Sequence, residues 1–176
     1  MLDKGLVHIY CGEGKGKTTA SVGLSARAAG SGLRVLFVQF LKDGRSGELK
    51  TLASVPGVTI LSGVPVKGFL REKEADARRR IADEHRARFE EAVREASTGA
   101  YDLLVLDEAA AAIDLGLIPL DEACAFLDAR PAGLEVVLTG REPPEPLLAR
   151  ADYISRIECV RHPYQKGIQA RKGIEW

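Results

Sequence analysis

A glycine-rich segment close to the N-terminus carries the residues best suited to chemistry. It reads Gly12-Glu13-Gly14-Lys15-Gly16-Lys17-Thr18-Thr19. Glycine lets backbone N–H groups turn toward a phosphate without a Cβ in the way. A lysine adds a point charge, and a threonine hydroxyl can ligate Mg²⁺. The segment therefore predicts a phosphate-binding loop, in which Lys17 meets a polyphosphate and Thr18 meets the metal.

The spacing in this segment differs from the general P-loop pattern, because Gly12 and Gly16 are separated by one residue fewer than that pattern has. The segment still follows an apolar run and opens a run rich in alanine, leucine and serine, which is the strand–loop–helix context of a nucleotide site. A glycine-rich turn without any ligand is the alternative interpretation. The context favours a nucleotide site with altered loop geometry, since the start of a helix also attracts anions.

Two acids follow a second apolar run. Residues 103–106 are apolar and are followed by Asp107 and Glu108, which is the form of a Walker B segment. At the C-terminal end of a parallel strand, such carboxylates face the crevice where ligands bind in open α/β folds. One of them can hold Mg²⁺, directly or through water. A charge pair at a helix N-terminus is the alternative, but beside a phosphate loop the metal role is favoured.

Apolar runs recur along the chain with helical stretches between them. Most runs are continuously apolar, as in strands covered on both faces of a parallel sheet; they span 6–11, 34–40, 58–61, 101–107, 134–139 and 153–160. Helices are expected at 17–29, 71–97, 120–127 and 144–150. The alternation predicts an α/β fold, with a mostly parallel sheet of about six strands and helices on both faces. This is the three-layer, RecA-like arrangement of P-loop NTPases.

The overall composition limits the remaining classes of function. The 176 residues suit a single domain, 1–176. Lys and Arg together number 25, as do Asp and Glu, so no overall field is expected to hold nucleic acid. The three cysteines, Cys11, Cys124 and Cys159, are far apart and predict neither a disulfide framework nor a zinc site. We find no signal peptide and no membrane-spanning run, and therefore expect a cytoplasmic protein without a membrane partner.

The motifs, taken in order, resemble those of the P-loop-type ATP:corrinoid adenosyltransferases of cobalamin synthesis and salvage. The resemblance covers nearly the whole chain, and the shortened loop 12–19 is the family's own version. The other matching segments are Arg27-Ala28, Val38-Gln39-Phe40-Leu41-Lys42, Gly47-Glu48, Val105-Leu106-Asp107-Glu108, Arg130-Pro131, Val136-Val137-Leu138-Thr139-Gly140-Arg141, Ala151-Asp152, His162-Pro163 and Gly167-Ile168-Gln169-Ala170-Arg171-Lys172-Gly173-Ile174-Glu175.

This resemblance implies transfer of the 5′-deoxyadenosyl group of ATP to the Co(I) of a reduced corrinoid, with release of triphosphate. ATP and the corrinoid would be the substrates, Mg²⁺ (or Mn²⁺) the metal, and a reductase or flavoprotein the electron donor. A homodimer is also implied. Because the first predicted strand begins within a few residues of Met1, we do not expect the long N-terminal arm that covers the partner's site in some relatives.

The resemblance also implies roles for individual residues. Lys17, Arg141 and Glu108 become catalytic candidates, and Thr18 with Glu108 the metal ligands, with Asp107 as the alternative ligand. Arg27 would meet charge on ATP or simply face solvent, and His162 would touch the corrinoid or cap the tail. The expected cofactor-binding set is Gly12, Glu13, Gly14, Lys15, Gly16, Lys17, Thr18, Thr19, Arg27, Gln39, Phe69 and His162.

One departure concerns the corrinoid side. Many members carry a Phe-x-Trp pair before the long helix, where aromatic rings press on the corrinoid. Here residues 62–69 read Ser-Gly-Val-Pro-Val-Lys-Gly-Phe, so only Phe69 is aromatic, with Val64 and Val66 as an apolar wall.

Two other functions stay open: a small P-loop kinase or NTPase that cleaves the γ-phosphate, and a nucleotide-sensing module without turnover.

Overall fold

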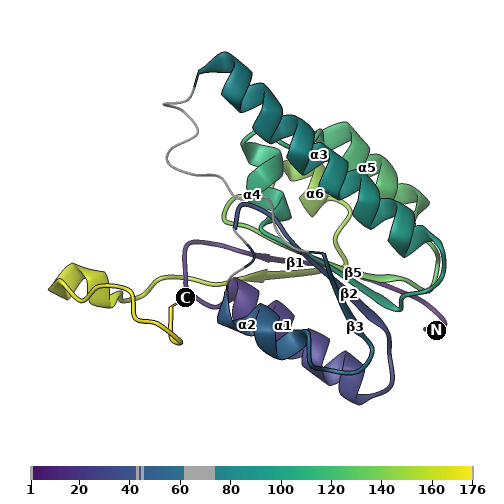
Figure 1. Cartoon of the computed structure of the whole chain (residues 1–176), viewed down its shortest axis with the longest axis horizontal. Coiled ribbons are helices and arrows are strands. Elements are labelled where there is room, and N and C mark those ends of the chain that lie inside the picture. The colour runs from purple at the N-terminus through teal and green to yellow at the C-terminus, as the bar shows by residue number, and fades with distance from the viewer. Residues whose placement is uncertain (1, 43, 45, 62–73, 176) are drawn as a thin grey trace.

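The fold is built on one six-stranded, fully parallel sheet (Figure 1). The computed structural model describes residues 2–42, 44, 46–61 and 74–175. The strands are β1 (Val7–Cys11), β2 (Val35–Gln39), β3 (Val58–Leu61), β4 (Leu103–Asp107), β5 (Glu135–Thr139) and β6 (Tyr153–Arg156). They lie in the order β3-β2-β4-β5-β1-β6, so β5 separates the strand before the phosphate loop from the strand that ends at Asp107.

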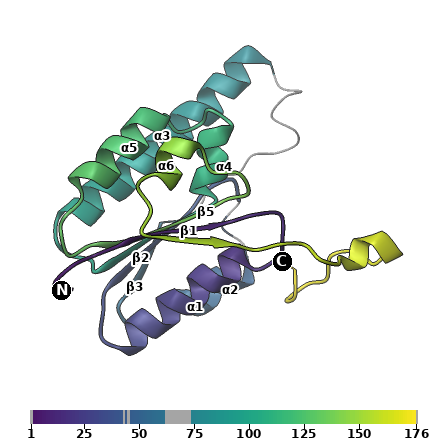
Figure 2. The same ribbon diagram turned by 180° about the vertical axis from the view of Figure 1, so that it is seen from behind.

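Helices cover both faces of the sheet, which confirms the predicted three-layer α/β fold (Figures 1 and 2). One face carries α1 (Lys17–Gly30) and α2 (Gly47–Leu52). The other carries α3 (Ala75–Ser97), α4 (Ala109–Asp114), α5 (Leu120–Ala129) and α6 (Glu145–Leu148). Each face has its own core because successive side chains of a strand point to opposite sides.

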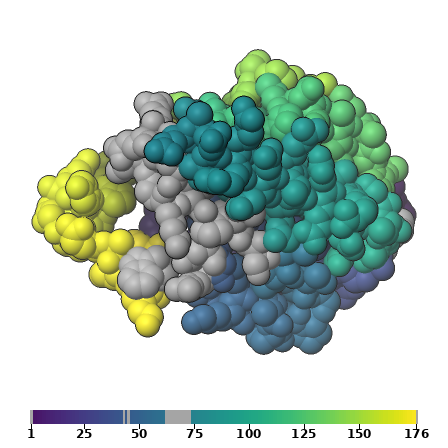
Figure 3. Space-filling view, turned by 45° about the horizontal axis from the view of Figure 1, so that its top comes forward, coloured from purple at the N-terminus to yellow at the C-terminus, as the bar shows by residue number. Residues whose placement is uncertain are grey.

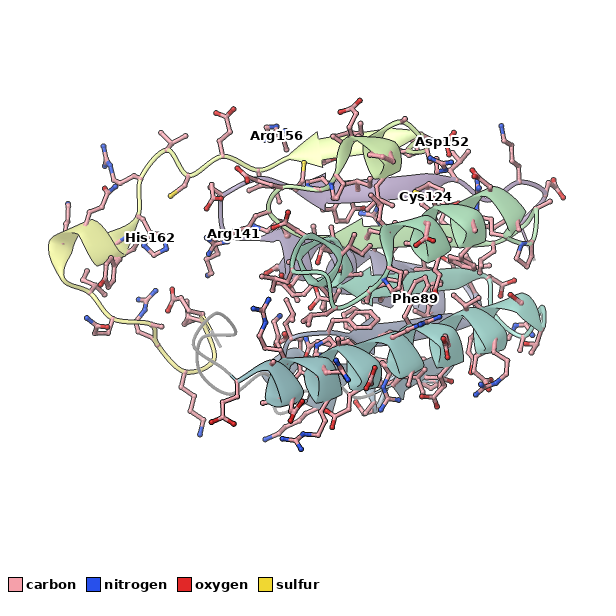
Figure 4. All side chains as sticks on the ribbon, turned by 90° about the horizontal axis from the view of Figure 1, so that it is seen from above. Phe89, Cys124, Arg141, Asp152, Arg156 and His162 are labelled. Atoms are coloured by element: carbon pink, nitrogen blue, oxygen red, sulfur yellow. The ribbon has the colours of Figure 1, made fainter. Side chains whose placement is uncertain are left out.

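Strand β2 shows this alternation. Its Val35 and Phe37 belong to the cluster under α1 and α2, while Leu36 and Val38 belong to the larger cluster on the opposite face. On that face Phe89 of α3 meets Phe126 of α5 edge to face, with ring centroids 6.2 Å apart. Phe89 of α3 and Cys124 of α5 both belong to the cluster on this face of the sheet (Figure 4). Strands β2 and β4 are buried at every position, as predicted for strands covered on both faces, whereas the edge strand β6 is exposed along its whole length.

Several boundaries differ from the sequence-based expectation. Helices α2 and α4 were not expected, since each is only a short turn-and-a-half after a strand. The helix expected at 71–97 begins at Ala75, and residues 71–73 lie outside the described part of the chain. The strand expected at 153–160 ends at Arg156, because its partner β1 ends at Cys11, the residue paired with Arg156.

The C-terminal segment leaves β6 and extends away from the sheet (Figures 1 and 3). It contains one short 3-10 helix, η2 (Pro163–Lys166), and its residues are almost all exposed. Within the described residues, no helix is both long and apolar enough to cross a membrane. Because all strands run parallel, the phosphate loop, Lys42, Glu108, Arg141 and this segment all follow carboxyl ends at the same edge of the sheet.

Candidate active site

The phosphate loop packs against the segment that follows β6. The N–H of Gly14 donates to the carbonyl of Ile157 at 2.8 Å. Gly12 has φ 97°, and a Cβ at that position would lie 2.4 Å from the Ile157 carbonyl oxygen. A Cβ at Gly14 would lie 2.7 Å from the carbonyl oxygen of Glu158. Side chains are excluded here by backbone on the outer side of the loop, which explains why these positions are glycine.

Lys17, the first residue of α1, holds its charge over the loop. Its Nζ donates to the carbonyl oxygens of Gly12 at 2.6 Å and Gly14 at 2.8 Å. No acidic residue lies in the first turn of α1, so the positive end of this 14-residue helix is not neutralised by its own sequence. The loop amides, the helix terminus and the ammonium group together favour an anion at this position.

Asp107 is a fully buried carboxylate that connects three strands and the phosphate loop. Its Oδ1 accepts hydrogen bonds from the hydroxyls of Thr18 and Thr139, both at 2.8 Å. Its Oδ2 accepts from Gln39 Nε2 and from Lys42 Nζ, both at 3.1 Å. Both carboxylate oxygens are thus fully engaged, so Asp107 acts as the hydrogen-bond centre beneath the loop.

Glu108 faces the cavity that Asp107 supports. Its backbone is left-handed, with φ 62°, and its N–H donates to Thr139 Oγ1 at 2.8 Å. Burial raises the pKa of its carboxyl, and the nearby charge of Asp107 raises it further. Lys42, Lys17 and Arg141 oppose this rise in the pKa because they favour the ionised form. A cation bound beside Glu108 would stabilise the ionised form of its carboxyl.

A cavity of about 610 Å³ lies over the phosphate loop. It brings together most of the residues singled out from the sequence: Glu13, Gly14, Lys15, Gly16, Lys17, Thr18, Thr19, Glu108, Arg141 and His162. Figure 4 shows Arg141 at the side of the body that faces the segment carrying His162. Arg141 Nη1 also contacts Glu13 Oε2 at 3.1 Å across the mouth of the loop, and its side chain is 70% exposed.

Among the predicted residues, Arg27 and Gln39 lie away from this cavity. Arg27 lies in the last turn of α1 and lines a separate small cavity of about 190 Å³, so the structure does not bring it to the phosphate loop. Gln39 is buried and contacts Asp107 rather than the cavity. His162 lines the cavity and also caps η2, since the N–H of Tyr164 donates to its Nδ1 at 3.2 Å. Phe69 lies outside the described residues.

Sequence reasoning gave no role to Lys42, Thr139 or the end of the tail. Lys42 Nζ lies 3.1 Å from Asp107 Oδ2 and 3.3 Å from Thr18 Oγ1. The tail returns to the loop, so that Gly173, Ile174 and Glu175 line the same cavity and Glu175 Oε1 lies 3.8 Å from Lys15 Nζ. Each of these residues lies in a segment that matches the family. The resemblance was therefore the signal in the sequence that could have identified them.

The parallel sheet, the glycine loop at the start of α1 and the acids at the end of β4 define a P-loop nucleotide-binding protein. A solved structure of Thermomonospora curvata EccC (ATPases 2 and 3) in complex with a signal sequence peptide has the same kind of fold. It matches with a TM-score of 0.52 and 18% identity, covering 91% of this chain and 32% of that chain.

Comparison with known sequences identifies the family. A family model described as ATP:corrinoid adenosyltransferase BtuR/CobO/CobP matches residues 3–176. The corrinoid adenosyltransferase CobA of Salmonella typhimurium is 33% identical, over 99% of this chain and 87% of its own. A corrinoid adenosyltransferase of Pseudomonas aeruginosa is 34% identical, over 99% of this chain and 85% of its own. The chain belongs to the ATP:corrinoid adenosyltransferase family, a family of transferases, and the kinase or sensor alternatives are not favoured.

Proposed function

We propose that this site transfers the 5′-deoxyadenosyl group of ATP to the Co(I) of a reduced corrinoid. The electron pair of Co(I) forms the new bond to ribose C5′. The C5′–O bond breaks, and its electrons leave with inorganic triphosphate. The reaction is a substitution at carbon, so the protein must align C5′ with the cobalt and stabilise charge on the departing triphosphate.

One observation carries this proposal: Lys17, Glu108 and Arg141 converge on a single cavity over a phosphate loop. The loop amides and Lys17 provide donors for the triphosphate, and Arg141 can turn from Glu13 toward it because its side chain is mostly exposed. Fixed positive groups at a developing anion are usually a large part of catalysis. The same groups would serve a leaving triphosphate of the kind that this reaction releases.

We propose that Mg²⁺ is bound by Thr18 and Glu108, with Asp107 orienting the Thr18 hydroxyl from below. The donors are all oxygen, which suits Mg²⁺, and the ammonium of Lys42 already places a positive charge between Thr18 and Asp107. Among the described residues no group of three or more His, Cys, Asp or Glu side chains could hold a metal. The ion would therefore also need phosphate oxygens, and it would neutralise charge on the triphosphate.

The corrinoid is proposed to approach from the side of the C-terminal segment. His162 and Ile174 line the cavity there, and Val160 and Tyr164 on the same segment are 93% and 67% exposed. Exposed apolar side chains beside a polar cavity suit a large macrocycle that has an apolar ring face and polar substituents. We further propose that a reductase or flavoprotein supplies electrons to the cobalt. We also propose that the protein forms a homodimer, and the exposed side chains of Tyr153 and Ile154 on edge strand β6 support this proposal.

An anaerobic assay tests the proposal. The protein is mixed with ATP, Mg²⁺ and chemically reduced cobalamin, the visible spectrum is followed for a cobalt–carbon bond, and the phosphate products are separated. Adenosylcobalamin and triphosphate in equal amounts are expected. ADP or orthophosphate as the product would instead indicate phosphoryl transfer or hydrolysis, and tight ATP binding without any product would indicate a sensor.

A further inference from the structure

The chain turns sharply where β2 leaves the sheet. Leu41 has φ 60°, which makes it, together with Glu108, one of the two non-glycine residues with positive φ in the described ranges. An L-residue with a branched, bulky side chain adopts this left-handed conformation only where its surroundings hold it there. Such backbone strain tends to occur at functional sites. The contacts around Leu41 therefore show what maintains the turn.

A buried histidine holds the turn from the neighbouring helix. The N–H of Leu41 donates to Nε2 of His85 at 3.4 Å, and His85 is 0% exposed in the middle of α3. Nδ1 of the same ring lies 2.8 Å from the carbonyl oxygen of Ile81. A carbonyl can only accept, so Nδ1 carries the proton and Nε2 is left as an acceptor. The ring must be neutral to do this, and burial lowers the pKa of His85, which keeps it neutral.

The turn at Leu41 determines where the next residue points. Lys42 reaches back to Asp107 and Thr18, the carboxylate and hydroxyl beneath the phosphate loop. The residue before the turn is fixed as well, since the N–H of Phe40 donates to the Asp107 carbonyl at 2.9 Å and its ring stacks on His85 with centroids 6.3 Å apart. A contact chain thus runs from His85 through the Leu41 amide to the Lys42 ammonium.

We propose that His85 is a positioning residue for the triphosphate end of the site. By accepting the N–H of Leu41 it fixes the turn after β2 and so places the Lys42 ammonium at Thr18 and Asp107. His85 touches no substrate and acts through Lys42. The inference rests on the proposed function in assigning this end of the cavity to triphosphate. It adds Lys42 to the groups that bind triphosphate and makes His85 the residue that positions Lys42.

A histidine that merely fills the core is the competing explanation, and a double-mutant cycle separates the two. His85→Phe keeps a ring against Phe40 but has no acceptor, and His85→Gln keeps an acceptor. Lys42→Met removes the charge, and Phe89→Leu is a matched control on the same core face of α3. The dissociation constant of ATP is measured by calorimetry with and without Mg²⁺, and KM and kcat are measured for both substrates in the anaerobic assay.

His85→Phe is expected to raise the dissociation constant and the KM of ATP about tenfold, because the Lys42 ammonium is then misplaced and its charge-assisted contact with the triphosphate is lost. The KM of the corrinoid should stay unchanged. Lys42→Met should do the same, the double variant should be no worse than Lys42→Met alone, and His85→Gln should recover part of the loss. Losses that multiply in the double variant, or an equal loss in Phe89→Leu, would overturn the positioning role.

One measurement needs no substitution. Because the chain has only three histidines, the ring nitrogens of His85 can be assigned by nitrogen-15 NMR of the unaltered protein. A proton on Nδ1 is expected, and a proton on Nε2 would refute the contact with Leu41. If the unaltered protein made no triphosphate, the proposed function would fail, whereas the binding and NMR data would still decide the role of His85.

Discussion

The hydroxyl of Thr18 donates to Oδ1 of Asp107 at 2.8 Å, although 89 positions separate the two residues in the chain. This contact joins the first turn of α1 to the end of β4. It holds the phosphate loop against the strand that supplies the acids, so the parts of the site are assembled before any ligand arrives. Preorganisation of this kind reduces the cost of binding a highly charged molecule.

Asp107→Asn should lower the free energy of unfolding by about 1–3 kcal/mol. The amide has one acceptor oxygen in place of two, so either the two threonine hydroxyls or Gln39 and Lys42 lose their acceptor. The negative charge opposite the Lys42 ammonium is lost in both orientations. Urea unfolding followed by circular dichroism measures the change. An unfolding curve identical to that of the unaltered protein would mean that the Lys42 contact contributes nothing.

Lys17→Ala should abolish turnover and weaken ATP binding by about tenfold or more, because it removes a charge-assisted contact on the polyphosphate. Calorimetry with ATP and the anaerobic assay provide the two measurements. Lys50→Ala, at an exposed position in the last turn of α2, is the control for loss of a positive charge. Wild-type kinetics in Lys17→Ala would show that Lys17 does not bind the triphosphate and that the proposed position of the triphosphate is wrong.

Glu108→Gln should remove most of the dependence of ATP binding on Mg²⁺. An amide keeps the size of the side chain but is a far weaker ligand for this cation than a carboxylate. ATP affinity is therefore compared with Mg²⁺ and with a chelator, for this variant and for the unaltered protein. If Mg²⁺ strengthened binding equally in both, another residue would have to be the ligand.

Arg141→Ala should reduce kcat by about 100-fold while leaving stability almost unchanged. The contact of Arg141 with Glu13 is exposed, so losing it should not affect folding. Arg150→Ala, which breaks the ion pair with Asp128 elsewhere on the surface, is the matched control. A fall in thermal stability that accounts for the lost activity would argue against a role on the triphosphate.

Acid stability should depend on Asp102, which lies far from the site. Hydrogen bonds from the backbone N–H and side chain of Arg34 lower the pKa of its carboxyl from 3.8 to about 2. A lowered carboxyl pKa stabilises the fold above the unfolded value, and this contribution disappears as the pH falls through about 2. Asp102→Asn should thus cost about 2 kcal/mol at neutral pH, with a difference that shrinks in acid. Urea unfolding across this pH range measures it, with Asp83→Asn at an exposed position of α3 as control. A pH-independent difference would contradict the linkage.

Much of the fold could be predicted because strands and loops leave local signals. A run such as 103–106, apolar at every position, indicates a strand covered on both faces, so six strands and two helical layers could be predicted from the chain. The loop 12–19 and the acids 107–108 were recognisable for the same reason, since phosphate and metal chemistry restricts residue types and spacing. The end of β6 was not predictable, because a strand ends where its partner ends.

The arrangement of the site depended on contacts between distant segments. The same helix α1 carries Lys17 at its start and Arg27 in its last turn, and only the direction of the helix away from the loop excludes Arg27 from the cavity. Lys42 lies in a motif that matches the family, but its contact with Asp107 depends on the left-handed turn at Leu41, which the sequence does not reveal. Residue patterns thus determined the class of chemistry, because that information is local. Which side chains share the cavity was decided by packing, because hydrogen bonds such as that between His85 and Leu41 join segments whose separation the sequence does not constrain.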